Sequence, residues 1–182
     1  MAIKDPVTEM PSLRLLRDLY RTLDEDLAAC FRYVEPVGEH ALTYSIEFMR
    51  LHAQACMGLG SLLDLWYKRL TRDDPAKKAE PNIGDYHFIF DDGSVQIDRG
   101  RTLNVRGSPG YLVTPFHGWR KVAPPTWWRD YNDTKHHFTL ATFRLGNLDN
   151  ALNALAGFYL AIHDWRTLRT HPLDSKVFEV MT

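Results

Sequence analysis

Apolar residues recur at steps of three and four along the first part of the chain, the spacing of one buried face of an α-helix. In residues 12–34 this face consists of Leu13, Leu16, Tyr20, Leu23, Leu27, Cys30 and Val34. Pro36 and Gly38 break the pattern, and a second, longer helix follows with its face at Ile46, Met49, Ala53, Cys56, Gly60, Leu63, Tyr67 and Leu70. Two long helices with a short joint predict an antiparallel pair, with Ser12 as the N-cap of the first.

The middle of the second predicted helix has unusually small side chains, namely Ala53, Ala55, Cys56, Gly58, Gly60 and Ser61. Small side chains allow a neighbouring helix to approach closely. We interpret them first as a packing surface within the chain. A contact between two copies of the chain would suit the same residues.

The hydrophobic period changes after a charged connector bounded by prolines at residues 72–81. Residues 86–90, 91–94 and 95–97 predict a strand, a tight turn and a second strand, and residues 103–105 and 111–113 could add further short strands. We therefore expect a β-rich insertion at residues 84–125, between the second and third helices. Long insertions in compact domains are often functional, and this one carries Arg99, Arg101, Arg106, Arg120 and Lys121.

The helical period returns after Pro125, with Thr126 as the expected N-cap of a third helix that extends to about Leu140. Asn147 or Asp149 would cap a fourth helix whose apolar face is Leu148, Leu152, Leu155, Tyr159 and Ile162. The tail beyond residue 169 is expected on the surface, with one short strand at residues 177–180. The predicted fold class is mainly α, a four-helix antiparallel bundle with a small β-hairpin insertion, forming a single domain over residues 1–182.

Composition narrows the choice of function. The chain has 182 residues, 45% of them hydrophobic, and a formal net charge of −1, so any nucleic-acid contact must come from a local patch. Cys30 and Cys56 fall within helical patterns, which favours buried thiols in a reducing cytoplasm over a structural disulfide. The polar first ten residues do not resemble a signal peptide, and no apolar run has membrane-spanning length. We expect a cytoplasmic protein without a membrane partner.

Residues 127–137 are the densest chemical stretch, with the sequence WWRDYNDTKHH. On a helix, Arg129, Asn132 and His136 share one edge about 10 Å long, with Lys135 beside it and His137 about a third of a turn away. Guanidinium binds phosphate through two parallel hydrogen bonds, and imidazole transfers protons near neutral pH. This edge is the candidate site.

Each residue of the stretch also has a structural interpretation. Trp127 and Trp128 could anchor the helix in the core or against the strands, or they could stack on a base. Arg129 could pair with a nearby acid such as Asp130, Asn132 could bond a backbone carbonyl, and His136 could be an ordinary helical histidine. Adjacent histidines on a helix cannot both face one ion, so we predict no metal site and no cofactor.

The aromatic pair, the Tyr131-Asn132 and Lys135-His136 dipeptides and the Asn- and Ala-rich stretch at residues 147–157 together resemble the HEPN-like superfamily of helical-bundle proteins, in an uncharacterised bacterial branch. Ribonucleases of that superfamily carry an Arg, usually followed by a polar residue, and then a His with four to six residues between the Arg and the His. Arg129, Asp130 and His136 match the long end of this spacing. The departures are that long spacing and the second histidine, His137.

The resemblance implies a metal-independent endoribonuclease acting at a two-fold homodimer interface, in a defence or toxin–antitoxin context. Arg129 and His136 would be catalytic, with Asn132, Lys135, Asp130 and Trp128 supporting them or binding substrate. The alternative is a non-catalytic HEPN-like module that binds a nucleotide, RNA or a protein partner through the same face. A stress or defence scaffold is a third interpretation.

Overall fold

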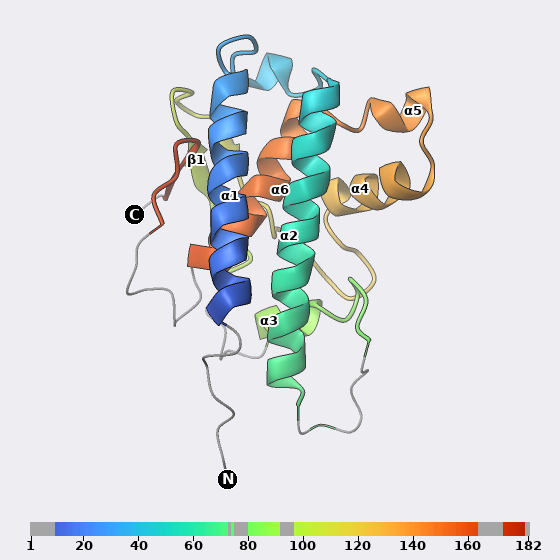
Figure 1. The fold of residues 1–182 in the computed structure, drawn as a ribbon. Coiled ribbons are helices and arrows are strands. Elements are labelled where there is room, and N and C mark those ends of the chain that lie inside the picture. The colour runs from blue at the N-terminus through green and yellow to red at the C-terminus, as the bar shows by residue number, and fades with distance from the viewer. Residues whose placement is uncertain (1–9, 73, 75–79, 92–96, 164–172, 181–182) are drawn as a thin grey trace.

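The computed structural model describes residues 10–72, 74, 80–91, 97–163 and 173–180. Two long helices, α1 (Met10–Cys30) and α2 (Ile46–Leu70), stand side by side and run in opposite directions, and α6 (Leu148–His163) crosses behind both (Figure 1). The antiparallel pair expected from the apolar spacing is therefore confirmed. None of the helices in the described part of the chain is long and apolar enough to cross a membrane.

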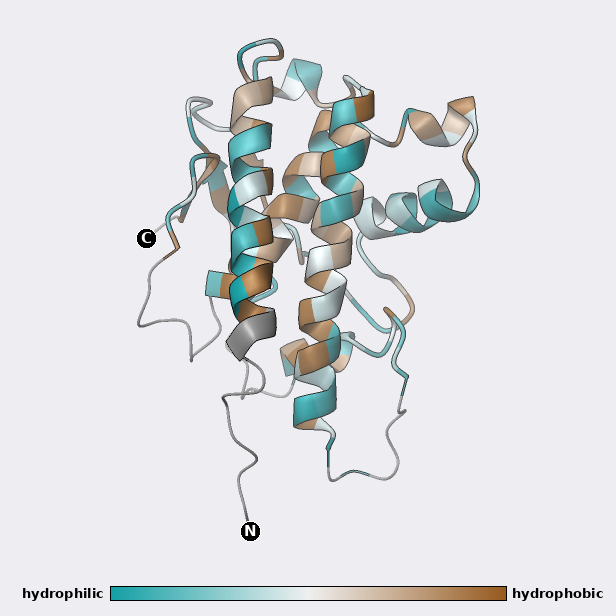
Figure 2. Cartoon of the chain, viewed as in Figure 1, coloured by the Kyte–Doolittle hydropathy of each residue, from teal (hydrophilic) through white to brown (hydrophobic). Residues whose placement is uncertain are grey.

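Helix α6 lies at the centre of the core. Its residues are buried on nearly every side, and it is largely hydrophobic in Figure 2. Phe158 meets the ring of Tyr20 edge-on, with the centroids 5.8 Å apart. A Cβ atom at Gly58 would lie only 2.6 Å from the Phe158 ring. The small residues of α2 thus serve packing within the chain, at Gly58 and at buried Ala55 and Cys56.

The burial of α2 differs from the predicted face. Its buried residues are Phe48, Leu51, His52, Ala55, Cys56, Gly58, Leu59, Leu62, Leu63, Trp66 and Tyr67. The predicted face included Ile46, which is 71% exposed, and Met49 and Ala53, which are only half-buried. The buried side of α2 is centred on Phe48, Leu59 and Trp66, about a quarter of a turn from the predicted face, so Ile46 falls outside it.

Several hydrogen bonds set the helix ends. Ser45 caps α2 by accepting a hydrogen bond from the Phe48 amide at 3.0 Å. Asn147 caps α6 as expected, accepting from the Asn150 amide at 2.9 Å. Helix α1 begins at Met10, so Ser12 lies inside the helix and is not its N-cap. A proline at position 11 is tolerated there because amides of the first turn have no helical partner.

The segment 86–90 is not a strand. Residues His87–Asp91 form the short helix α3. Residues 92–96, which include most of the expected turn and the first two residues of the strand expected at 95–97, lie outside the described residues, and Ile97 is not in a strand. Tyr86 and Ile89 are both buried and lie three residues apart, which is a helical spacing. The ring centroids of Tyr86 and of Tyr67 in α2 are 6.2 Å apart. Packing against the end of α2 therefore selects helix over strand.

The strands β1 (Leu103–Val105) and β2 (Leu112–Val113) are present as an antiparallel pair, and β3 (Phe178–Val180) completes a sheet with the order β2-β1-β3. Gly107 and Gly110 have positive φ in the connecting turn, a conformation that favours glycine. The expected insertion is not an appendage, since it supplies core residues: Tyr86, Ile89, Ile97, Leu103, Val105, Val113, Phe116 and Trp119.

The final described segment is not a surface tail. Leu173, Val177 and Phe178 are buried in the core. Buried Asp24 of α1 holds the segment by accepting hydrogen bonds from the Ser175 hydroxyl and the Lys176 amide, both at 2.6 Å. The strand expected at residues 177–180 is confirmed, whereas His171 and Pro172 lie outside the described residues.

Candidate functional site

The densest stretch of the sequence forms α4 (Thr126–His136), which projects to one side of the long helices together with α5 (Leu140–Phe143) (Figure 1). Pro125 occupies the N-cap position, where Thr126 was expected. The Pro125 carbonyl accepts hydrogen bonds from the amides of Trp128 and Arg129. Thr126 is instead the first helical residue, and its hydroxyl accepts a hydrogen bond from the Arg129 guanidinium at 3.1 Å.

The two tryptophans anchor the start of α4. Trp127 donates its indole N–H to the Pro115 carbonyl at 2.9 Å, and its own carbonyl bonds to the buried His52 ring at 2.8 Å. Trp128 is 6% exposed and packs against Trp119 and Trp127. Stacking on a base needs an exposed ring face, so the Trp128 ring as placed serves packing and not the supporting role expected for it.

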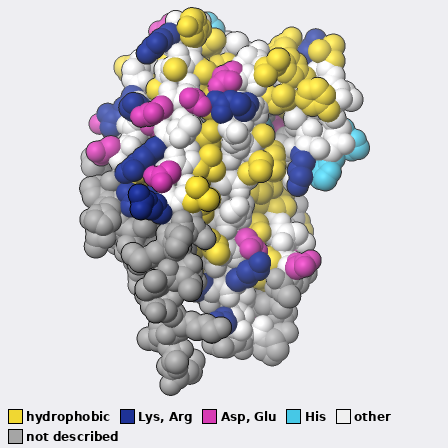
Figure 3. All heavy atoms as spheres, in the orientation of Figure 1, with side chains coloured by type: hydrophobic (Ala, Val, Ile, Leu, Met, Phe, Trp, Pro, Cys, Tyr) yellow, Lys and Arg dark blue, Asp and Glu magenta, His cyan; other side chains and the backbone are white. Residues whose placement is uncertain are grey.

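The remaining residues of the predicted edge lie together on the outside of α4. Arg129 and His136 are exposed and Asn132 is half-buried. The helical period places these three side chains opposite Trp127 and Tyr131, which face the core. Lys135 is exposed beside them, and Figure 3 shows histidine and basic side chains gathered over this part of the molecule.

Asp130 was expected to support the site, but it ties α4 to α6. Its carboxylate accepts a hydrogen bond from the Asn150 side chain at 2.8 Å, and the same amide group donates to the Leu145 carbonyl at 2.8 Å. Asn150 is buried at the start of α6. Asp130 therefore faces the fold and not the outer edge.

Helix α4 ends at His136 and does not extend to Leu140. His137 is the C-cap residue and is exposed, as expected, and its carbonyl accepts a hydrogen bond from the Thr142 hydroxyl. Thr139 and Thr142 then form a capping box that starts α5. This new start explains why the helical pattern of the sequence continues while the helix itself stops.

The electrostatics of the edge have two sources. Lys135 and His136 lie in the last turn of α4, where the unpaired helix carbonyls favour positive charge. Arg129 adds a third basic group one turn from the helix start. Among the described residues, no group of three or more His, Cys, Asp or Glu side chains could hold a metal ion.

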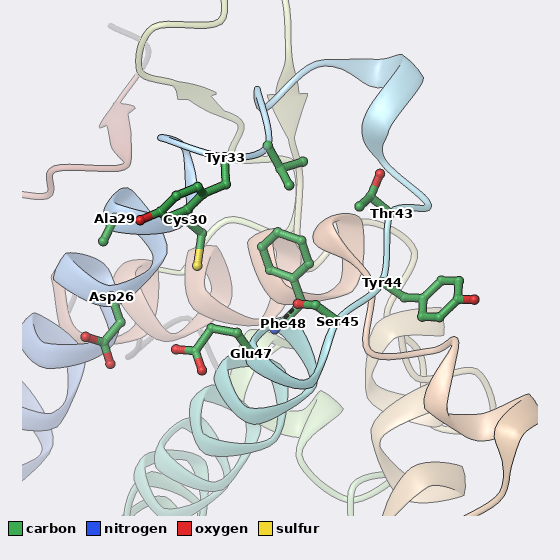
Figure 4. Close-up of a pocket in the computed structure, with 10 residues that line it drawn as sticks. Asp26, Ala29, Cys30, Tyr33, Thr43, Tyr44, Ser45, Glu47 and Phe48 are labelled. Carbon is green, nitrogen blue, oxygen red and sulfur yellow. Dashed lines mark hydrogen bonds between the residues drawn. The ribbon is translucent and has the colours of Figure 1, made fainter.

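A second feature was not predicted from the sequence. A pocket of about 570 Å³ lies between the last turns of α1 and the first turn of α2 (Figure 4). Asp26 and Cys30 line it from α1 and Glu47 and Phe48 from α2. These pairs are separated by a loop, and no local motif joins them, so the sequence carries no signal for the pocket. Burial, followed by the nearby carboxylates of Glu47 and Asp26, raises the pKa of the Cys30 thiol.

The chain was compared with models of protein families, with curated proteins and with solved structures, and no match was found in any of the three comparisons.

Proposed function

We propose that the protein is a HEPN-like, metal-independent ribonuclease whose active site is completed by a second copy of the chain. The observation that carries the proposal is the exposure of Arg129 and His136 on the one side of α4 that the core does not use. Asn132 lies between them on the same side. The proposed bundle consists of α1, α2, α4 and α6, which is supported by their order and by the packing of α4 on α2 and α6.

The chemistry requires two proton transfers. One His136 would accept the proton of a ribose 2′-OH, whose oxygen attacks the adjacent phosphorus and forms a 2′,3′-cyclic phosphate. The bond from phosphorus to the 5′-oxygen breaks, and that oxygen takes a proton from a second imidazole. Arg129 would stabilise the charge on the pentavalent phosphate. One edge offers a single His136, so a second copy supplies the missing acid.

An apolar patch beside the edge supports self-association. We define this patch by its exposed residues Leu42, Tyr44, Ile46, Phe138 and Leu140, of which Phe138 is 73% and Leu140 69% exposed. The rings of Tyr44 and Phe143 meet edge-on at 5.7 Å and join the start of α2 to α5. Figure 3 shows hydrophobic side chains gathered there, next to the histidines of α4. Two copies that bury this patch around a two-fold axis would bring their α4 edges together.

The second candidate is a non-catalytic module that binds RNA, a nucleotide or a protein through the same edge. Both candidates place the protein in the cytoplasm. It is favoured by the contact of Arg129 with Thr126 and by the position of Lys135 and His136 in the last helical turn. Both features are explained by helix stability alone. The two candidates differ in whether RNA is cleaved.

Labelled single-stranded RNA incubated in EDTA separates them. We expect wild type to release fragments ending in a 2′,3′-cyclic phosphate, and Arg129→Ala and His136→Ala each to slow cleavage by about 10²-fold or more. His137→Ala is the matched control and should cleave like wild type. Circular dichroism checks the fold of each variant. RNA binding without cleavage by wild type would favour the module, and cleavage surviving in His136→Ala would remove this residue from the mechanism.

Light scattering tests the second copy. We expect a dimer at micromolar concentration, and we expect Leu140→Asp to give a monomer that no longer cleaves RNA. Leu15→Asp is the control, because Leu15 is equally exposed at 70% but lies on α1, outside the apolar patch. A wild-type monomer that cleaves RNA would contradict the shared site.

A further inference from the structure

The pocket between α1 and α2 lies apart from the outer edge of α4 and has a different chemistry. Its volume of about 570 Å³ is in the range of small-molecule sites, which span roughly 300–1,000 Å³. Figure 4 shows the rings of Tyr33 and Phe48 and the thiol of Cys30 around the space, with the carboxylates of Asp26 and Glu47 together on one side. An apolar wall therefore meets an acidic rim.

The acidic rim is only partly neutralised. Arg50 donates to Asp26 at 2.5 Å and to both oxygens of Glu47. Its Nη1 is directed to Gln54 at 2.7 Å. One guanidinium thus serves two carboxylates, which leaves a net charge of −1 on these three groups. The bond from Arg50 uses Oδ2 of Asp26, and among the described residues no donor reaches Oδ1.

The apolar wall suits an aromatic or aliphatic body. Phe48 is buried at its base, whereas Tyr33 is 87% exposed and its ring would lose water contact when the pocket is filled. Val34 and Cys30 complete the wall. The face of a tyrosine ring also attracts cations, so the same ring favours a ligand that carries positive charge. Burial is the largest cause of the raised pKa of Cys30, and the carboxylates of Glu47 and Asp26 add to it.

We propose that this pocket binds a small organic amine, with an apolar body against Phe48 and Val34 and a single ammonium group at the Asp26 carboxylate. An anion would meet the excess negative charge of Asp26 and Glu47. A neutral alcohol of the same shape would fill the apolar wall and donate one hydrogen bond to Oδ1 of Asp26, but it would not offset the excess negative charge. The site is therefore selective for positive charge on an apolar scaffold.

A series of three probes with similar bodies tests the selectivity: 2-phenylethylammonium, 2-phenylethanol and 3-phenylpropionate. Binding to the full chain is followed by NMR titration of the backbone amides. We expect the ammonium probe to shift amides of the pocket and to bind about fivefold more tightly than the alcohol, which corresponds to one rim charge pair. We expect the carboxylate probe not to bind.

Three variants locate the effect. Asp26→Asn should weaken binding of the ammonium probe about fivefold and leave binding of the alcohol unchanged, because asparagine keeps an acceptor oxygen and Arg50 keeps its bonds to Glu47. Asp18→Asn, which removes an exposed carboxylate elsewhere on α1, should change neither. Ala29→Trp fills the pocket from an exposed position and should abolish binding of both. The proposal is overturned if the ammonium probe does not bind, if 3-phenylpropionate binds as well, or if Ala29→Trp leaves binding intact.

Discussion

Helices α6 and α4 carry polar residues for different reasons. The polar residues at the start of α6 serve the fold: Asn147 caps the helix and buried Asn150 holds Asp130. Helix α4 buries only Trp127 and Trp128, at its first turn. The chemistry of α6 is therefore explained by packing, while Arg129 and His136 on α4 are left without a packing role. Residues of the second kind are the better candidates for function.

The largest expected difference in stability is between substitutions of two phenylalanines, one in α6 and one just after α4. Phe158→Ala should lower the free energy of unfolding by about 3–5 kcal/mol, because it empties the space between Tyr20 and Gly58 in the core. Phe138→Ala, beyond the end of α4, should change it by less than about 0.5 kcal/mol when every chain in the comparison carries Leu140→Asp and is monomeric, because its side chain is exposed in the single chain. Urea titrations of the variants measure both. Equal losses would show that the projecting region is packed as tightly as the core.

The contact between α2 and the start of α4 should make stability depend on pH. Burial lowers the pKa of His52 to about 4, partly offset by its bond to the Trp127 carbonyl, against about 6.5 in the unfolded chain. The unfolded state therefore binds a proton more readily between these values. The contribution of neutral His52 is complete above pH 6.5 and is lost as pH falls through 4, a change of roughly 3 kcal/mol in the free energy of unfolding.

Unfolding by urea at a series of pH values tests this. His52→Gln keeps a donor for the Trp127 carbonyl but cannot titrate in this range, so its stability should fall less than that of wild type between pH 6.5 and 4. His136→Ala is the control, because this histidine is exposed, and its profile should follow wild type. Parallel profiles for wild type and His52→Gln would mean that His52 does not control the drop.

Much of the fold follows from local spacing. The buried residues Leu13, Tyr20, Leu23 and Leu27 of α1 were predicted because one helix face meets one surface. The predicted face of α2 was wrong at Ile46, because the buried side of that helix is centred on Phe48, Leu59 and Trp66, about a quarter of a turn away. Helix α3 and the burial of Leu173 depend on contacts between segments that are distant in the sequence. One such contact is the hydrogen bond that the Ser175 hydroxyl donates to the Asp24 carboxylate. The spacing of apolar residues within one segment does not predict such contacts.

The candidate site was predictable to a similar extent. The shared side of Arg129, Asn132 and His136 follows from helical geometry. The roles of Trp128 and Asp130 depend on which surfaces pack, and sequence spacing alone does not reveal that Asn150 reaches Asp130. The pocket at Asp26 and Glu47 joins two helices across a loop and was missed for the same reason.

A smaller contrast lies within α2. Gly58→Ala would place a Cβ atom 2.6 Å from the Phe158 ring, so we expect a loss of about 1–2 kcal/mol in the free energy of unfolding after the better helix propensity of alanine is included. Gly60→Ala is the matched control. Its Cβ would lie 3.3 Å from the Trp128 ring of α4, and stability should stay within about 0.5 kcal/mol of wild type. Thermal unfolding of both variants compares the two losses of stability, and the larger loss identifies which helix, α6 or α4, adjusts less to the added methyl group.

The smallest expected effect separates two polar residues of α4 itself. Asp130→Ala removes the acceptor that Asn150 uses to hold α4, while Asn150 keeps its bond to the Leu145 carbonyl, so the free energy of unfolding should fall by only about 1 kcal/mol. Asn132→Ala, on the outer edge, should change stability by less than about 0.5 kcal/mol. The Asn150→Ala variant and the double variant with Asp130→Ala complete a thermodynamic cycle, in which the two losses should not add because both break the same bond. Strictly additive losses would mean that Asp130 acts elsewhere, and its expected place beside Arg129 at the site would then regain support.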